Sequence, residues 1–219
     1  DRKAKTGKYP KAIIPVALYG MPYDIERIMA IANKYGIPVI EDAAEGFGSR
    51  FKGQVLGTFG QYGVLSFNGN KMITTSGGGA LICADEAQKN KIMWYATQAR
   101  EAYPYYQHEE IGYNYRMSNI CAGIGRGQMT IVNDHIAHHK HVQARYAELL
   151  KDLPGIHLHA APNADYDANY WLCTITIDPE VRIKGQENAY KETVKSAVGG
   201  AAGVIHQVDS PTTDCQPNE

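Results

Sequence analysis

The chain has 219 residues, with 22 Lys and Arg against 23 Asp and Glu, a formal net charge of -1 and four cysteines. A nearly neutral chain gives no electrostatic reason to expect nucleic acid or an acidic membrane surface as the partner, so small-molecule chemistry gains weight. No apolar run approaches the roughly 20 residues that span a bilayer. Cys83, Cys121, Cys173 and Cys215 lie far apart, without zinc-site spacing or the density of a secreted disulfide scaffold. We therefore expect reduced thiols in a cytoplasmic protein.

The two ends of the chain suggest a piece of something longer. The sequence begins without a methionine and stops in "SPTTDCQPNE", which has no helix or strand to close a domain. We expect an internal fragment that is cut at both ends. Its length allows one large domain and part of another.

The first elements predict a strand, a helix and a second strand. "AIIPVALYG" (residues 12–20) is a continuous apolar run and predicts a buried strand. Asp24 is the expected N-cap of a helix that stops at Gly36. "IPVIED" (residues 37–42) is the next strand. This order predicts a right-handed crossover between parallel strands, with Asp42 at a carboxyl strand end, where open α/β sheets bind ligands.

The rest of the chain continues the alternation of strands and helices. "GVLSF" (63–67) and "GALICAD" (79–85) predict strands, and a helix follows from about Glu86 to Arg100. Ser118 is expected to cap a long helix that runs to about Asp152. "NYWLCTITID" (169–178) predicts the strand that begins a second, smaller domain.

One lysine lies in unusual company. "SFNGNKMITTSGGG" (66–79) places Lys71 among small hydroxyl, amide and glycine residues. Most lysines are solvated surface charges, but here Asp42 and Glu45 follow a strand and Ser66 precedes the lysine. An amine for a Schiff base, a carboxylate for a pyridinium nitrogen and hydroxyl or backbone donors for a phosphate are what hold pyridoxal phosphate. The Walker and GxGxxG patterns are absent.

Three blocks carry a resemblance to a known family. "EDAAEGFGS", "GTFGQYGVLSFNGNKMITTSGGGALI" and "GYNYRMSN" together resemble the DegT/DnrJ/EryC1/StrS sugar aminotransferases, from about Ala12 to Asp178. The resemblance implies a fold type I pyridoxal-phosphate enzyme of the α/β class: three α/β/α layers around a mostly parallel sheet, with the start of a smaller α+β domain. It implies a partial large cofactor-binding domain at residues 1–150 and the truncated small domain at residues 151–219.

The resemblance also implies a role for each residue of the site. Lys71 would be the catalytic lysine, Asp42 the partner of the pyridinium nitrogen and Ser66 a phosphate ligand. Ala44 would let the ring lie flat, and Glu45 would approach the 3'-hydroxyl side. Taken alone, each polar residue also fits a plainer role: a helix cap for Asp42, a turn hydroxyl for Ser66 and a solvated loop carboxylate for Glu45.

The remaining implications concern partners and substrate. Asn114 in "YNYR" matches a residue that reaches the cofactor phosphate of the other subunit, which implies a homodimer with shared active sites. L-glutamate would be the amino donor and a nucleotide-linked keto sugar the acceptor, for surface glycan or glycoprotein sugars. "SFNGNK" and "ATQARE" (96–101) are similar to enzymes that aminate C4 of UDP-4-keto-6-deoxy-N-acetylglucosamine.

Several alternatives stay open. The enzyme could act at C3 or C4 of a dTDP- or GDP-linked sugar, or the chain could be a non-catalytic fragment. Members of the family are nearly twice this length, so we expect this polypeptide alone to be inactive. His135 and His139 have zinc-helix spacing but no HExxH pattern, and a solvated helix face is the competing interpretation. "AYPYYQHEE" (102–110) fits either a substrate loop or packed tyrosines.

Overall fold

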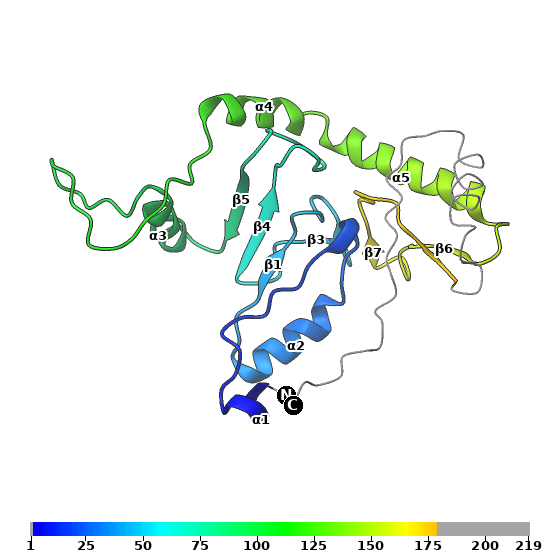
Figure 1. The fold of residues 1–219 in the computed structure, drawn as a ribbon, viewed down its shortest axis with the longest axis horizontal. Coiled ribbons are helices and arrows are strands. Elements are labelled where there is room, and N and C mark those ends of the chain that lie inside the picture. Colours follow the sequence, from blue (N-terminus) through cyan, green and yellow to red (C-terminus); the bar gives the residue numbers. More distant parts are fainter. Residues whose placement is uncertain (1, 179–219) are drawn as a thin grey trace, which may run out of the picture.

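The computed structural model describes residues 2–178, so Cys215 and most of the predicted small domain lie outside the described part. Its central sheet has the order β1–β4–β5 (Figure 1), formed by β1 (Ile40–Asp42), β4 (Tyr62–Ser66) and β5 (Gly79–Cys83). β1 and β4 are parallel, while β4 and β5 are antiparallel. The predicted strands at 63–67 and 79–85 are thus confirmed in this sheet.

The segment before α2 (Ile25–Tyr35) runs parallel to β1 but is not the regular strand that the sequence predicts. Ile13 donates to the Pro38 carbonyl and Ala17 donates to the Asp42 carbonyl, at 2.9 and 3.0 Å. Pro15 lies between them and has no N–H, so one rung of the ladder is missing and only isolated bridges remain. A 3-10 turn, η1 (Leu18–Gly20), then ends the segment. The parallel crossover itself is confirmed.

Helix α2 has the predicted ends. The Asp24 carboxylate accepts a hydrogen bond from the Arg27 N–H at 3.2 Å, and Gly36 stops the helix in the left-handed conformation at φ 62°. The apolar face of the helix packs against Ala43, which follows β1, and against Phe51 and Leu56 farther along the chain. The buried members of this core are Ala17, Ile25, Ala43, Phe51 and Leu56.

Short strands connect the beginning of the chain with its end. β2 (Arg50–Phe51) pairs with β3 (Gln54–Val55) and with β7 (Tyr166–Asp167), both antiparallel. β6 (Ile156–Leu158) and β8 (Ile175–Ile177) form a separate two-stranded sheet. The predicted strand at 169–178 is therefore regular only over its last part. The predicted division at residue 150 stays a prediction.

The predicted long helix is wrong in one respect, because it is two helices. Ser118 caps α4 (Asn119–Met129) by accepting from the Cys121 N–H at 3.2 Å, and α5 (Val132–Leu150) follows. Three glycines weaken α4, and the Thr130 hydroxyl donates to the Gly127 carbonyl where the helix ends. Figure 1 shows the two helices in a row along the top of the view, with α4 above β4 and β5 and α5 continuing toward β6.

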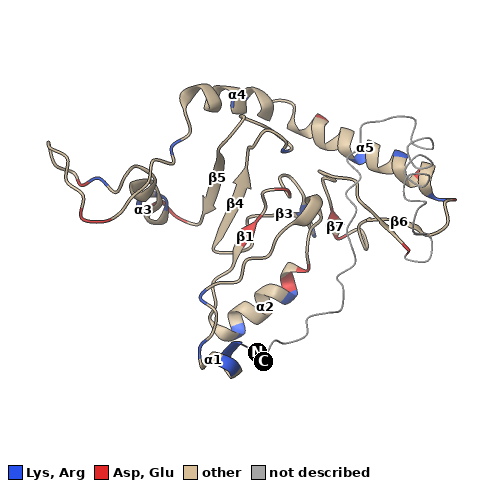
Figure 2. Ribbon diagram, in the orientation of Figure 1, with Lys and Arg blue, Asp and Glu red and all other residues tan. Residues whose placement is uncertain are grey.

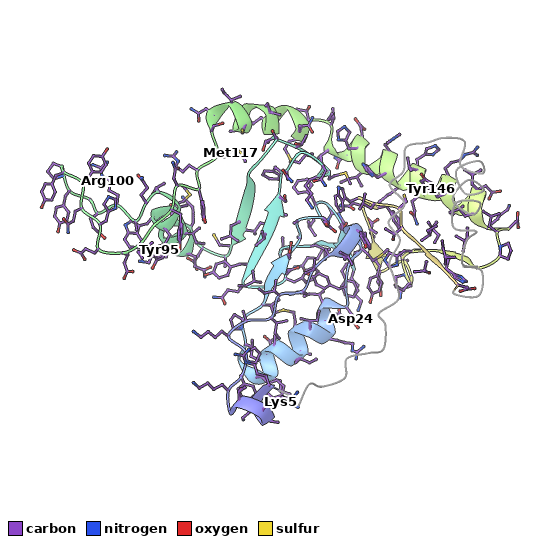
Figure 3. All side chains as sticks on the ribbon, in the orientation of Figure 1. Lys5, Asp24, Tyr95, Arg100, Met117 and Tyr146 are labelled. Atoms are coloured by element: carbon purple, nitrogen blue, oxygen red, sulfur yellow. The ribbon has the colours of Figure 1, made fainter. Side chains whose placement is uncertain are left out.

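Helix α3 (Glu86–Ala96) ends before the predicted Arg100, because Gln98 and Ala99 adopt left-handed backbone angles. Residues 97–117 then form a projecting arm, which carries Arg100 away from the sheet (Figure 3). A short helix, α1 (Arg2–Thr6), lies at the bottom of the view in Figure 1, below α2. Among residues 2–178, no helix combines the length and apolar character that membrane crossing requires.

Candidate functional site

β1 carries two consecutive carboxylates, Glu41 and Asp42, within the strand that Figure 2 colours red, and consecutive side chains of a strand face opposite sides of the sheet. Asp42 is in register with Val64 of β4, which is 37% exposed, so its side chain faces the more open side of the sheet. One carboxylate oxygen, Oδ1, accepts a hydrogen bond from the Ala44 N–H at 3.1 Å. Because Asp42 ends β1, its half-buried carboxylate lies at the carboxyl edge of two parallel strands.

Glu41 faces the core and was missed by the sequence analysis. It is 0% exposed and accepts four hydrogen bonds: from the Tyr23 hydroxyl and from the N–H groups of Gly57, Phe59 and Gly60. Burial, followed by the nearby Glu41 charge, raises the pKa of Tyr23 far above its ordinary value. Glu41 therefore organises the turn that leads into β4. The alternation of faces along a strand was the available signal.

The loop that carries Lys71 is anchored directly after the lysine. Met72 and Ile73, which follow it, are 4% and 2% exposed. The ring of His135 donates from Nδ1 to the Met72 carbonyl at 3.3 Å, and the Gln128 side chain accepts from the Thr74 N–H at 3.2 Å. Helices α4 and α5 thus fix the loop, which makes the lysine a residue of a rigid segment.

The amine of Lys71 lies between a carboxylate and an indole ring. Its Nζ is 3.4 Å from Glu45 Oε1 and 4.2 Å from the centroid of the Trp171 ring. The Lys71 and Glu45 side chains are only 14% and 19% exposed, so neither is a solvated surface group. The other Glu45 oxygen accepts from the Tyr19 N–H at 2.7 Å. The interpretation of Glu45 as a solvated loop carboxylate is therefore wrong.

Asn169 and Trp171 come from far along the chain, and the sequence analysis did not assign them to the site. Asn169 is 0% exposed and donates from Nδ2 to the carbonyls of Glu45 and Phe47, at 2.8 and 2.9 Å. Its Oδ1 accepts from the Trp171 N–H at 2.8 Å. Trp171 in turn donates from Nε1 to the Asn70 carbonyl at 2.7 Å. One buried amide thus joins the loop after β1 to the residue that covers Lys71.

The structure brings together five of the six predicted site residues. Asp42 and Ser66 end adjacent parallel strands, Ala44 and Glu45 follow Asp42, and Glu45 pairs with Lys71. Within residues 2–178 the Ser66 hydroxyl has one hydrogen bond, a long one that it accepts from the Asn68 N–H at 3.4 Å, and its own proton has no acceptor there. These residues offer an amine, carboxylates and a hydroxyl on one edge of the sheet, which are the groups that can hold a pyridine cofactor with a phosphate.

Asn114 is the predicted residue that lies elsewhere. It is exposed on the projecting arm and forms an isolated antiparallel bridge with Thr97. Its surroundings include Tyr113 and Tyr115, whose rings stack at 5.0 Å and which are 51% and 74% exposed.

The two histidines of α5, His135 and His139, bind backbone carbonyls, so the pair is neither a zinc site nor a solvated helix face in this structure. His135 contacts the Met72 carbonyl, and His139 donates from Nδ1 to the Tyr170 carbonyl at 3.2 Å. Both are half-buried, and burial lowers the pKa of His139. Among residues 2–178, no three His, Cys, Asp or Glu side chains gather as a metal site would need. Within the same range Cys83, Cys121 and Cys173 are free thiols, and burial raises the pKa of Cys173 to about 11.

Comparison with known proteins identifies relatives of this arrangement. The chain is 45% identical over 178 residues to the putative pyridoxal phosphate-dependent aminotransferase EpsN of Bacillus subtilis, covering 81% of this chain and 46% of that protein. It is 38% identical over 175 residues to GDP-perosamine synthase of Escherichia coli O157:H7, covering 80% and 47%. It therefore spans about half the length of these curated relatives.

A solved structure agrees with the fold. An aminotransferase from Brucella abortus matches with a TM-score of 0.75 and 28% identity, over 87% of this chain and 50% of that one. This likeness confirms the predicted fold class, that of the fold type I pyridoxal-phosphate enzymes, and agrees with the mixed sheet described above. The model of the DegT/DnrJ/EryC1/StrS aminotransferase family matches residues 3–207, and the chain belongs to this family.

Proposed function

We propose that the protein is a pyridoxal-phosphate-dependent aminotransferase that moves an amino group from an amino acid, L-glutamate in our proposal, to a nucleotide-linked keto sugar. The observation that carries this is the half-buried amine of Lys71, held 3.4 Å from Glu45 at the sheet edge where Asp42 ends β1. Family membership and relatives that are named as sugar-nucleotide or pyridoxal-phosphate enzymes support the same class of reaction.

The residues at this edge fit the cofactor by their chemistry. The Asp42 carboxylate has Oδ1 occupied by the Ala44 N–H, which leaves Oδ2 to hold a proton on a pyridine nitrogen. Ser66 provides a hydroxyl donor for a phosphate, and Ala44 provides a small side chain beside the carboxylate.

When bound, pyridoxal phosphate supplies an aldehyde that takes up the amino group and a ring that accepts an electron pair. Lys71 Nζ would bind the aldehyde carbon and, after the donor amine has displaced it, would move the proton of the amino acid α-carbon. Glu45 would accept a hydrogen bond from that amine, as it does in this structure. Asn169, by holding the Glu45 carbonyl, would keep this carboxylate in place.

Two kinds of sugar nucleotide are candidates for the amino acceptor. We propose C4 of UDP-4-keto-6-deoxy-N-acetylglucosamine, based on the blocks around Lys71 and residues 96–101. The named GDP-perosamine synthase among the relatives favours a GDP-linked sugar as the second candidate. The proton chemistry at the amino acid Cα would be the same for both, and the difference would lie in the residues that bind the sugar and its nucleotide.

We also propose that two copies share their active sites through the arm of residues 97–117. The arm exposes apolar and aromatic side chains that little else in the described chain covers: Tyr103, Tyr105, Tyr106, Ile111, Tyr113 and Tyr115 are 49–80% exposed. Asn114 lies on this arm, where a second copy would be needed to bring it to a cofactor phosphate. Mixing Lys71→Ala with Asn114→Ala should restore activity that neither variant has, since one site of the mixed dimer would be intact.

The test of the main proposal uses the intact protein with pyridoxal phosphate. Borohydride should fix the cofactor on Lys71, as read by absorbance and by mass spectrometry of the labelled peptide. Lys71→Ala should lose this attachment, whereas Lys89→Ala, whose side chain is 57% exposed, should keep it. A glutamate-coupled assay with UDP-, GDP- and dTDP-linked keto sugars then identifies the acceptor. Equal spectra for Lys71→Ala and the unchanged protein would sink the proposal and favour a non-catalytic role.

A further inference from the structure

We infer that Trp171 is a positioning residue for Lys71, and that Asn169 fixes it there; this inference rests on the proposed function of the same site. The indole ring lies 4.2 Å from the Lys71 amine, on which the Glu45 carboxylate also acts at 3.4 Å. An aromatic face attracts a cation through its quadrupole and excludes water from that side. The amine is therefore held from two directions by groups that lie 126 positions apart in the sequence (171 minus 45).

Trp171 is itself held through both its side chain and its backbone. Its Nε1 donates to the Asn70 carbonyl at 2.7 Å, directly before the lysine, and its backbone N–H donates to Asn169 Oδ1. The residue as a whole is 9% exposed. Tyr170, between the two, has a left-handed backbone at φ 51°, and its carbonyl accepts from His139 of α5. A strained residue persists only where its surroundings over-determine it, so this segment is built to present Trp171 in one orientation.

Asn169 connects both partners of the lysine. Its Nδ2 holds the Glu45 carbonyl, while its Oδ1 holds the backbone of Trp171. The Ser49 hydroxyl, which donates to the Gly20 carbonyl at 2.7 Å, accepts from the Asn169 N–H at 2.9 Å. The backbone of the residue with the carboxylate and that of the residue with the indole are therefore tied to one side chain. We call Glu45, Asn169 and Trp171 the lysine clamp.

The clamp has a defined consequence for the reaction. In the proposed reaction Lys71 would be released when the donor amine arrives, and its amine would then remove a proton and deliver it at a fixed place. A free lysine side chain has many rotamers, and ordering it costs entropy. Trp171 limits the released amine to positions near Glu45, so its loss should lower kcat more than it raises KM for the amino donor.

The chain contains a matched control. It has two tryptophans, and Trp94 has the same kinds of contact as Trp171: a lysine amine, Lys91 Nζ, at 3.8 Å from its ring, and an indole N–H that donates to the Arg100 carbonyl at 3.1 Å. Trp94 lies in α3, outside the clamp. Substitution of Trp94 therefore removes equivalent contacts without touching Lys71 or the clamp, and the labelling rate of Lys71 is the readout for this control.

The experiment compares Trp171→Leu, Trp171→Phe and Trp94→Leu in the intact protein. Without cofactor, the labelling rate of Lys71 by an amine-reactive reagent is measured by mass spectrometry. Loss of a partly desolvated aromatic face should raise it roughly 5- to 30-fold in Trp171→Leu. Trp171→Phe keeps an aromatic face and should recover most of the protection, and Trp94→Leu should label Lys71 at the unchanged rate.

Two more measurements separate this inference from the proposed function. The rate of cofactor attachment and the kcat for the amino donor should fall in Trp171→Leu and largely recover in Trp171→Phe. In a Trp94→Phe background, cofactor binding should quench the fluorescence of Trp171, the remaining tryptophan. Unchanged Lys71 labelling and unchanged kcat in a folded Trp171→Leu protein would overturn the positioning role and leave the function standing. If Trp171→Leu labels Lys71 faster but the unchanged protein attaches no cofactor, the proposed function would be overturned and the clamp would stand.

Discussion

Replacement of Glu41 by Gln should destabilise the protein strongly, although it changes one atom of a residue outside the proposed chemistry. The carboxylate is 0% exposed, and each oxygen accepts two hydrogen bonds: Oε1 from Phe59 and Gly60, and Oε2 from Tyr23 and Gly57. In Gln, an amide group replaces one oxygen. The Tyr23 hydroxyl can rotate to accept from that amide, but the buried Gly57 N–H cannot and is left facing another donor.

The magnitude follows from these contacts. A buried donor without an acceptor costs about 1–3 kcal/mol, and each remaining bond loses about 1 kcal/mol when its acceptor is no longer charged. The sum is about 3–5 kcal/mol, a large part of the usual 5–15 kcal/mol of a folded protein. Glu26→Gln is the control, because Glu26 pairs with Lys52 at 2.6 Å with its side chain 60% exposed and should cost less than about 1 kcal/mol.

The assay is equilibrium urea unfolding of the intact protein at neutral pH, with free energies compared at equal m-values. We expect the midpoint to drop for Glu41→Gln and to stay near that of the unchanged protein for Glu26→Gln. A free energy of unfolding for Glu41→Gln within about 1 kcal/mol of the unchanged protein would refute the reasoning, because it would mean that the turn at 57–60 does not depend on a charged acceptor.

Three further outcomes follow from other contacts. The pKa of Tyr23 is raised above its ordinary 10.0, chiefly by burial, so the unfolded chain loses this proton first and stability should fall as pH rises above that value; Tyr23→Phe should flatten the slope in alkaline unfolding curves, and Tyr105→Phe should not. Burial lowers the pKa of His139 below 6.5, so the unfolded chain takes up the proton first and stability should fall as pH drops below that value. Thermal melts should lose this pH dependence in His139→Gln. They should retain it in His138→Gln, the control, because His138 is exposed. Gly20→Ala would place a Cβ 1.8 Å from Asn169 Oδ1 at φ 87°, whereas Gly36→Ala meets no atom within 4 Å at φ 62°. Both pay for a left-handed backbone, about 1 kcal/mol, but only Gly20→Ala should also speed the labelling of Lys71, and equal labelling rates would count against the clamp.

Local features of the sequence determined the elements whose causes are local. Asp24 and Gly36 mark the ends of α2, and Ser118 caps α4, because capping needs only neighbouring backbone groups. Asp42 and Lys71 could be chosen because a strand end and a glycine-rich loop are visible in the order of residues. The errors also have local causes. Pro15 lacks the N–H for one hydrogen bond of the strand that the apolar run predicts, and the glycines of α4 precede a break in the predicted long helix.

Tertiary structure alone decided which distant groups meet around the lysine. Nothing near Lys71 in the chain indicates that Trp171 covers it, or that Asn169 holds the carbonyl of Glu45. Likewise, strand alternation indicates that Glu41 and Asp42 face opposite sides of the sheet. Only the neighbours of β1 decide that Glu41 lies in the core and Asp42 faces the open side. Periodicity and capping act over one or two turns of chain, whereas burial and pairing depend on segments more than a hundred residues apart, which only the folded arrangement brings together.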